Sequence, residues 1–138
     1  MADKNFRSFR EYHAYLRSIV SQATLTKLSF AIRVEESGKK STAEIFVDGS
    51  RFVFDDGAAL RCYELVRIEN GVIIRDRYAY HYQRPDGFYF RYDNDPLRAQ
   101  PNVHECLHLH VNAESPRFPT HETDFEQIFQ FILAVYYP

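Results

Sequence analysis

Apolar side chains repeat with two different periods along this chain. Between residues 6 and 20 they recur at spacings of three and four, which places them on one side of a helix. The same spacing returns after Thr123 and Glu126, whose separation is that of a helix-capping box. The pattern therefore predicts one helix over 6–20 and a second helix that starts at 123.

Between these two segments, apolar and polar residues alternate, which is typical of strands with one buried face. Asn70-Gly71 suits the two-residue turn of a β-hairpin, and residues 84–87 (Arg-Pro-Asp-Gly) suit a second hairpin loop. The expected strands are 28–34, 43–47, 51–54, 60–69, 72–83, 88–93 and 104–111.

Together these elements predict an α+β fold. A curved, mostly antiparallel sheet of about six or seven strands would have the N- and C-terminal helices packed on one face, because that arrangement buries every apolar face. The length of 138 residues is common for one domain. No linker or repeat divides the sequence, so we expect residues 1–138 to form a single domain.

The loop at 85–87 predicts how the two strands beside it pair. With a three-residue loop, Tyr82 lies opposite Phe90, and His81 lies opposite Arg91. One face of this hairpin is then aromatic, and the other carries histidine, arginine, glutamine and aspartate. A shift by one residue would mix the two faces, so the pattern favours this register.

The turn at 70–71 predicts a second pairing in the same way. With a two-residue loop, Glu64 lies opposite Arg77 and forms a cross-strand ion pair with it. Arg75 and Arg77 have the same parity as His81, so we expect all three on one face.

The expected strand 104–111 repeats the alternation. Its leucines point to one side, and its histidines, His104, His108 and His110, point to the other. If the leucines join the aromatic core, these histidines face the same side of the sheet as His81.

Composition narrows the range of functions. The chain has 17 basic and 19 acidic residues and a net charge of −2, which excludes a strongly basic nucleic-acid-wrapping protein but is compatible with a local cationic site. Two cysteines cannot form a disulfide framework or a four-thiolate zinc site. No apolar run approaches the roughly 18 residues that span a membrane, and no signal-peptide pattern is present. We therefore expect a cytoplasmic protein that does not bind membranes, and the sequence leaves a homo-oligomer open.

The polar face predicts a ribonuclease that needs no metal or other cofactor. A histidine can take the proton of a 2′-hydroxyl, a second protonated group can donate to the leaving oxygen, and an arginine can stabilise the charge on the phosphate. The candidate catalytic residues are His81, Arg91, Asp93, His108 and His110. The candidate substrate-binding residues are Arg75, Arg77, Gln83, Tyr89 and His104.

Three other interpretations remain open. His108 and His110 have the spacing of two metal ligands on one side of a strand, and with a carboxylate such as Asp93 they would form the site of a metal-dependent hydrolase. The same face could instead bind a nucleic acid or a protein partner without turnover. It could also be an ordinary solvated surface.

One block of this polar face also resembles a known protein family. The block consists of residues 77–83 (Arg-Tyr-Ala-Tyr-His-Tyr-Gln), 85–87 (Pro-Asp-Gly) and 90–94 (Phe-Arg-Tyr-Asp-Asn), followed by Pro96. It is similar to the TumE family of small toxins from bacterial and archaeal toxin–antitoxin modules. The histidine-rich segment and the last helix continue the resemblance.

The resemblance implies a growth-inhibiting toxin that acts as a ribonuclease. It also implies a partner, a helix-turn-helix DNA-binding antitoxin that neutralises the toxin. Carried over by position, the implied site consists of His81, Arg91, Asp93 and the histidines of 104–110.

Overall fold

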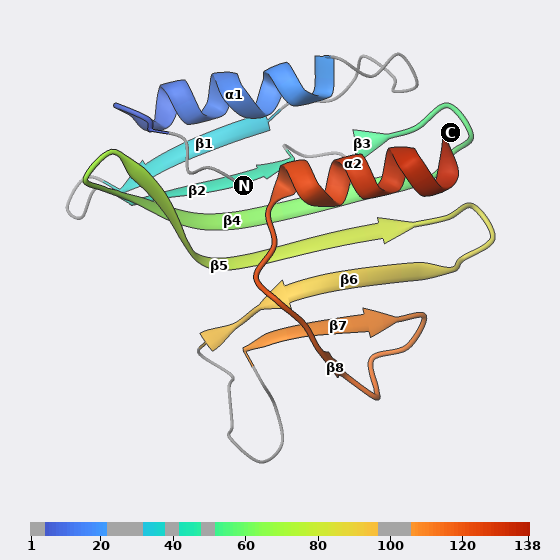
Figure 1. Ribbon diagram of the computed structural model, residues 1–138. Coiled ribbons are helices and arrows are strands. Elements are labelled where there is room, and N and C mark those ends of the chain that lie inside the picture. Colours follow the sequence, from blue (N-terminus) through green and yellow to red (C-terminus); the bar gives the residue numbers. More distant parts are fainter. Residues whose placement is uncertain (1–4, 22–31, 38–41, 48–51, 97–105) are drawn as a thin grey trace.

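Two helices lie on one side of an open antiparallel sheet (Figure 1). The computed structural model describes residues 5–21, 32–37, 42–47, 52–96 and 106–138. Within these residues, six strands of five or more residues form the sheet: β1 (Ile32–Ser37), β2 (Thr42–Val47), β4 (Ala59–Glu69), β5 (Val72–Gln83), β6 (Tyr89–Asn94) and β7 (Leu107–Val111). The two-residue strands β3 (Phe52–Val53) and β8 (Phe118–Pro119) pair with β4 and β7.

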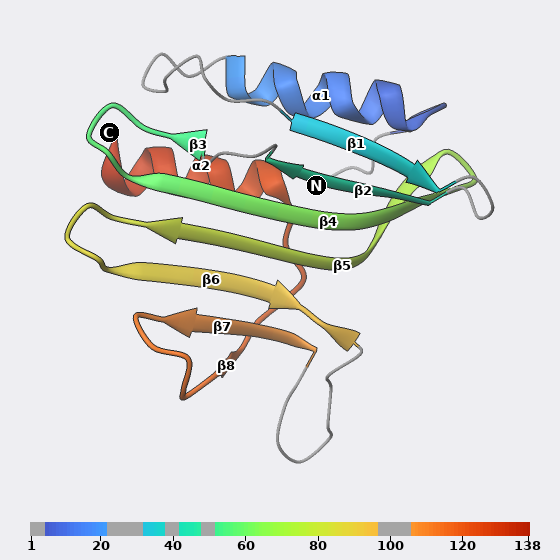
Figure 2. The same ribbon diagram turned by 180° about the vertical axis from the view of Figure 1, so that it is seen from behind.

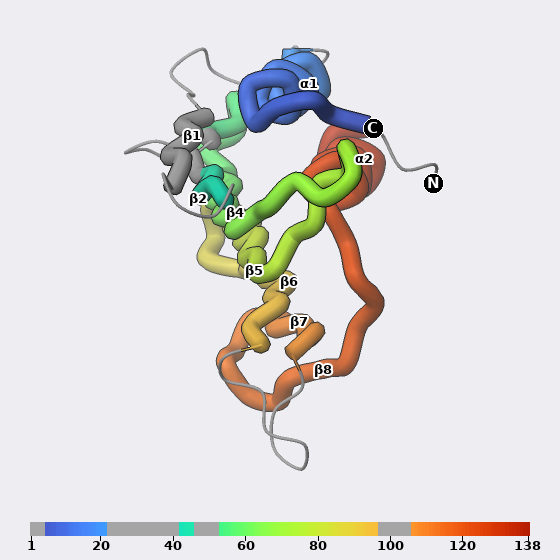
Figure 3. Tube along the Cα trace, turned by 90° about the vertical axis from the view of Figure 1, so that its left-hand side faces the viewer, coloured from blue at the N-terminus to red at the C-terminus, as the bar shows by residue number. Residues whose placement is uncertain are grey.

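The strands follow the order β1-β2-β4-β5-β6-β7-β8. Helix α1 (Phe9–Ser21) and helix α2 (Phe125–Tyr136) lie against the same face of this curved layer, as the side view in Figure 3 shows. The predicted α+β fold with both helices on one face is confirmed. Neither described helix, with 13 and 12 residues, is long and apolar enough to cross a membrane.

Helix α1 begins three residues later than its apolar pattern predicts. Ser8 caps the helix, because its Oγ accepts a hydrogen bond from the backbone N–H of Glu11 at 3.2 Å. The Glu11 carboxylate in turn accepts from the backbone N–H of Arg7 at 2.5 Å. The first bond satisfies a donor that the first helical turn would leave unpaired, and the second ties the residue before the cap to the helix.

Helix α2 is capped by Asp124, one residue beyond the predicted Thr123. The Asp124 carboxylate accepts from the backbone N–H of Gln127 at 2.8 Å, and Asp124 itself has extended backbone angles. The Thr123 hydroxyl instead donates to the side chain of Gln127 at 3.0 Å. A carboxylate at a helix N-terminus also interacts favourably with the helix dipole, which a neutral threonine cannot do.

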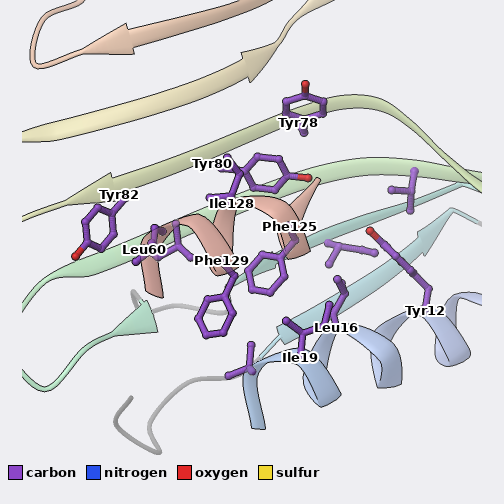
Figure 4. Close-up of a cluster of buried hydrophobic side chains, with 14 of the residues drawn as sticks. Tyr12, Leu16, Ile19, Leu60, Tyr78, Tyr80, Tyr82, Phe125, Ile128 and Phe129 are labelled. Carbon is purple, nitrogen blue, oxygen red and sulfur yellow. The ribbon is translucent and has the colours of Figure 1, made fainter. Parts of the chain in front are cut away.

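The hydrophobic core lies between the two helices and the sheet (Figure 4). Tyr80 and Tyr82 of β5 and Leu60 of β4 are fully buried there. Helix α2 contributes Phe129 and helix α1 contributes Leu16, both at most 3% exposed. The aromatic face predicted from the hairpin register is therefore the core face of the sheet.

The β5–β6 hairpin has the predicted register. Tyr82 pairs with Phe90, and His81 pairs with Arg91. Gly87 closes the loop with a φ of +96°, a conformation that favours glycine. Strict alternation on both strands made this pairing predictable.

The β4–β5 hairpin departs from its predicted register because β5 contains a bulge. Val66 pairs with Arg75 but Leu65 pairs with Arg77, so Asp76 is an extra residue without a partner in β4. The predicted pairing of Glu64 with Arg77 is wrong, since Glu64 lies opposite Tyr78.

The bulge also turns Arg75 away from the other predicted site residues. Arg75 points to the helix side, where it lies 3.9 Å from Asp124 and 3.5 Å from the hydroxyl of Tyr12. Glu64 lies in the same buried cluster and accepts from the hydroxyls of Tyr12 at 2.6 Å and of Tyr80. The expectation that Arg75 shares the face of His81 is therefore wrong.

The other differences concern the ends of strands. The expected strand 51–54 is shorter, and the short strand β8 lies outside the expected strands. The expected strand 28–34 lies mostly outside the described residues, and β1 continues to Ser37. Strand β7 starts at Leu107, and His104 lies outside the described residues.

Candidate functional site

The face of the sheet opposite the helices carries a row of basic and histidine side chains. We call this face the outer face; Figure 2 views the sheet from this side. Arg61 on β4 pairs with His81 on β5, His81 pairs with Arg91 on β6, and Arg91 pairs with His110 on β7. Paired residues of neighbouring strands point to the same face. These four residues therefore form one row across four strands, which we call the transverse row.

Next to the transverse row, three side chains converge on one carboxylate oxygen. Asp93 Oδ2 accepts from Arg91 Nε at 2.9 Å and lies 3.2 Å from the Nε2 atoms of both His108 and His110. Asp93 pairs with His108 across β6 and β7, which brings these groups together on the outer face. The sequence places these four residues on the same face, and the structure shows them in contact.

The connection between β7 and β8 folds over this cluster. Its Glu114 accepts hydrogen bonds from Arg91 at 3.2 Å and from the hydroxyl of Tyr89 at 3.0 Å. The backbone carbonyl of Glu114 accepts from Nδ1 of His110 at 3.0 Å. His108 and His110 are consequently 3% and 1% exposed, whereas the side chain of Arg91 is 25% exposed.

Charge and burial set the protonation of the cluster. Burial lowers the pKa of His81, and the positive charges of Arg61 and Arg91 lower it further. The hydrogen bond that His81 donates to Gln83 acts in the opposite direction. Burial and the charge of Arg91 also lower the pKa of His110, although the carboxylates of Asp93 and Glu114 act to raise it. Both imidazoles are thus neutral near pH 7.

The carboxylates keep Arg91 charged. Burial alone would lower the pKa of Arg91, but the hydrogen bonds and charges of Asp93 and Glu114 raise it. Burial would raise the pKa of Glu114, yet Tyr89 and Arg91 hold it below its usual value. A fixed positive charge therefore lies between two neutral imidazoles of the transverse row.

The predicted substrate-binding residues that the structure describes lie in three different places. Tyr89 stacks on His81 with ring centroids 4.8 Å apart and an angle of 8° between the rings, and Gln83 Oε1 lies 3.3 Å from His81 Nε2. Arg77 lies on the outer face at 3.7 Å from Asp95, away from the transverse row. Arg75 belongs to the helix side, so it is not part of this site.

Two residues of the site are missing from the sequence prediction. Arg61 faces His81 only because of the bulge at Asp76; without it, Arg61 would pair with Tyr80 and point into the core. A register without a bulge would place the charged Arg61 on the aromatic core face. This mismatch is the sequence signal that could have indicated the bulge. Glu114 reaches the site from a loop, which no strand periodicity predicts.

The same cluster also has the donor set of a metal site. Single ligand atoms of Asp93, His108 and His110 lie within 4.8 Å of one another. The Glu114 carbonyl holds the proton on Nδ1 of His110, which leaves Nε2 free to ligate when the ring is neutral. Arg91 Nε at 2.9 Å from the same carboxylate oxygen opposes a cation at this point.

Comparison with known proteins agrees with the resemblance seen in the sequence. No curated protein and no solved structure matches the chain. The family model described as Toxin TumE matches residues 16–135, which include all the described strands, helix α2 except its last residue, and the C-terminal part of α1. The match identifies a toxin of a toxin–antitoxin system, which implies a cognate antitoxin as partner. The chain belongs to the TumE toxin family.

Proposed function

We propose that this toxin is an endoribonuclease that cleaves RNA by general acid–base catalysis without a metal ion. The observation that carries the proposal is the order of three residues in the transverse row. His81 and His110 lie on the two sides of Arg91, each on the neighbouring strand. A phosphate held by Arg91 would therefore have one imidazole on each side.

Cleavage of RNA requires two proton transfers on opposite sides of the phosphorus. His81 takes the proton of the 2′-hydroxyl, whose oxygen then attacks the phosphorus. The bond from phosphorus to the 5′-oxygen breaks, and His110 in its protonated form gives that oxygen a proton. The products are a 2′,3′-cyclic phosphate and a 5′-hydroxyl.

The spacing of the strands suits this arrangement. Neighbouring strands lie about 4.8 Å apart, so the backbones of β5 and β7 are separated by roughly 9.6 Å. Side chains from both strands can reach a phosphate held between them on β6. Arg91 would stabilise the charge that develops on the phosphate oxygens, because its guanidinium donates several hydrogen bonds at fixed geometry.

Asp93 positions the other groups. Its Oδ2 contacts Arg91, His108 and His110 together, so one carboxylate sets the direction of all three side chains. The negative charge of Asp93 opposes the burial and the Arg91 charge that lower the pKa of His110, and so increases the fraction of His110 in the protonated form that the acid step needs.

Glu114 occupies the place where we expect the substrate phosphate. Its carboxylate accepts from Arg91 and Tyr89, the two donors that a phosphate would use. The side chain of Glu114 is 65% exposed, so an RNA phosphate can replace it with little loss of packing. Displacing the loop that carries Glu114 would also give the substrate access to His110.

The test is cleavage of RNA by the purified toxin in EDTA, with analysis of the product ends. We expect 2′,3′-cyclic phosphate and 5′-hydroxyl ends. His81→Gln should lower kcat by about 10²–10⁴-fold, the usual contribution of a general base. The exposed His121 provides the control, because His121→Gln should leave kcat unchanged. Absence of cleavage, or undiminished cleavage by His81→Gln, would contradict the proposal. Tight binding of RNA without cleavage would instead favour a non-catalytic binding module.

A metal-dependent hydrolase is the second candidate, favoured by the donor set of Asp93, His108 and His110. Elemental analysis of the purified toxin decides it. A stoichiometric divalent ion that disappears in His108→Gln would support a metal centre. Full activity of a metal-free sample would exclude it.

A further inference from the structure

We propose that Arg61 forms a second phosphate subsite, which binds single-stranded RNA next to the phosphate that is cleaved. This inference rests on the proposed function and names a further substrate contact. Arg61 lies at the β4 end of the transverse row, beside His81 and two strands away from Arg91.

The subsite is hollowed into the surface. A pocket of about 180 Å³ opens on the outer face where β4 begins and β5 ends. It is lined by Gly57, Ala59, Arg61, His81, Gln83, Arg84 and Pro85. Polar side chains supply most of this lining, so the pocket suits an anionic or hydrogen-bonding group better than an apolar one.

The charge of Arg61 is available to a ligand. Arg61 is exposed, and no carboxylate among the described residues lies within ion-pair distance of it. Arg84, which lines the same pocket, is paired with Asp56 at 2.8 Å. Arg91 is paired with Asp93 and Glu114. An incoming phosphate would therefore meet first the charge of Arg61, which pairs with none of the described carboxylates.

The geometry of the row suits a nucleic-acid strand. Arg61 and Arg91 are two strands apart, roughly 9.6 Å between backbones. Their long side chains can hold neighbouring phosphates of one strand that runs across the sheet. A cationic track of this kind binds the backbone without reading the bases.

The experiment measures the affinity of a 2′-O-methyl RNA oligonucleotide, which cannot be cleaved, by fluorescence anisotropy at several salt concentrations. Each phosphate contact with a single strand contributes about 0.7 to the slope of log K against log salt. Arg61→Ala should reduce the slope by that amount. The affinity ratio of wild type to variant should then shrink about 2.6-fold between about 50 and about 200 mM salt.

The control variant is Arg10→Ala, which removes an exposed arginine from α1 on the opposite side of the sheet and should change neither slope nor affinity. A DNA oligonucleotide should lose the same slope with Arg61→Ala, because the subsite contacts phosphate. In cleavage assays Arg61→Ala should raise KM, as expected when a contact that binds the substrate is lost.

The outcomes separate the two proposals. If wild-type toxin binds and cleaves RNA but Arg61→Ala binds with an unchanged slope, the subsite is wrong and the ribonuclease proposal stands. If wild-type toxin neither binds nor cleaves RNA, both are wrong. Circular dichroism of the variant shows whether it is folded.

Discussion

Replacing Asp93 by asparagine should cost more stability than the same change at an exposed ion pair. Asp93→Asn keeps the size of the side chain but removes the charge that Arg91, His108 and His110 share. The side chain of Asp93 is only 13% exposed, so water cannot replace these contacts fully. The free energy of unfolding of Asp93→Asn therefore measures how much the charge of Asp93 stabilises the cluster of Arg91, His108 and His110.

The magnitude follows from the number of contacts. A hydrogen bond to a charged group contributes roughly 1.5–3 kcal/mol, and a bond between neutral groups about 1 kcal/mol. The contacts of Asp93 with Arg91 and His108 would each lose part of this difference, and partial exposure of Arg91 reduces the sum. We expect a loss of about 2 kcal/mol in the free energy of unfolding.

Urea denaturation at pH 7 measures this loss, with an unchanged m value as the sign that only stability has changed. Asp76→Asn is the matched control, because the Asp76–Arg67 pair is 39% exposed on both sides and should contribute less than about 1 kcal/mol. Equal losses in the two variants would refute the idea that Asp93 organises a buried cluster.

Three further predictions follow from the same contacts. Glu114→Gln should strengthen RNA binding and raise kcat/KM, measured by anisotropy and cleavage, because it frees Arg91 from a competing carboxylate. The pKa of His81 should lie below 6.5 in an NMR titration, and Arg61→Gln should move it upward, because the charge of Arg61 lowers it. Burial raises the pKa of Glu64 above 4.5, so the folded state binds the carboxyl proton of Glu64 more tightly than the unfolded state does. The stabilisation that this proton provides is present at low pH and should be lost as pH rises through the raised pKa. Denaturation of Glu64→Gln at several pH values should not show this pH dependence.

The sequence predicts the β5–β6 hairpin well because two signals agree there. The turn at 85–87 limits the loop length, and alternation on both strands leaves one register that separates aromatic from polar side chains. This register places His81 opposite Arg91. The leucine and histidine alternation of β7 then places His108 and His110 on the same face.

The β4–β5 hairpin shows what periodicity alone cannot supply. A bulge adds one residue to one strand, and its position depends on side-chain packing on both faces. Here it buries Arg75 beside Tyr12 and Asp124 and brings Arg61 to the outer face. Contacts from loops, such as that of Glu114 with Arg91, depend on tertiary structure and have no periodic signal.

The most direct test of the central claim is a double-mutant cycle on kcat for RNA cleavage in EDTA, with His81→Gln, His110→Gln and the double variant. If the two histidines act on one phosphate held by Arg91, the double variant should be about as slow as the slower single variant, because groups that act as a unit are strongly non-additive. Losses that multiply, or a single variant with wild-type kcat, would contradict the account.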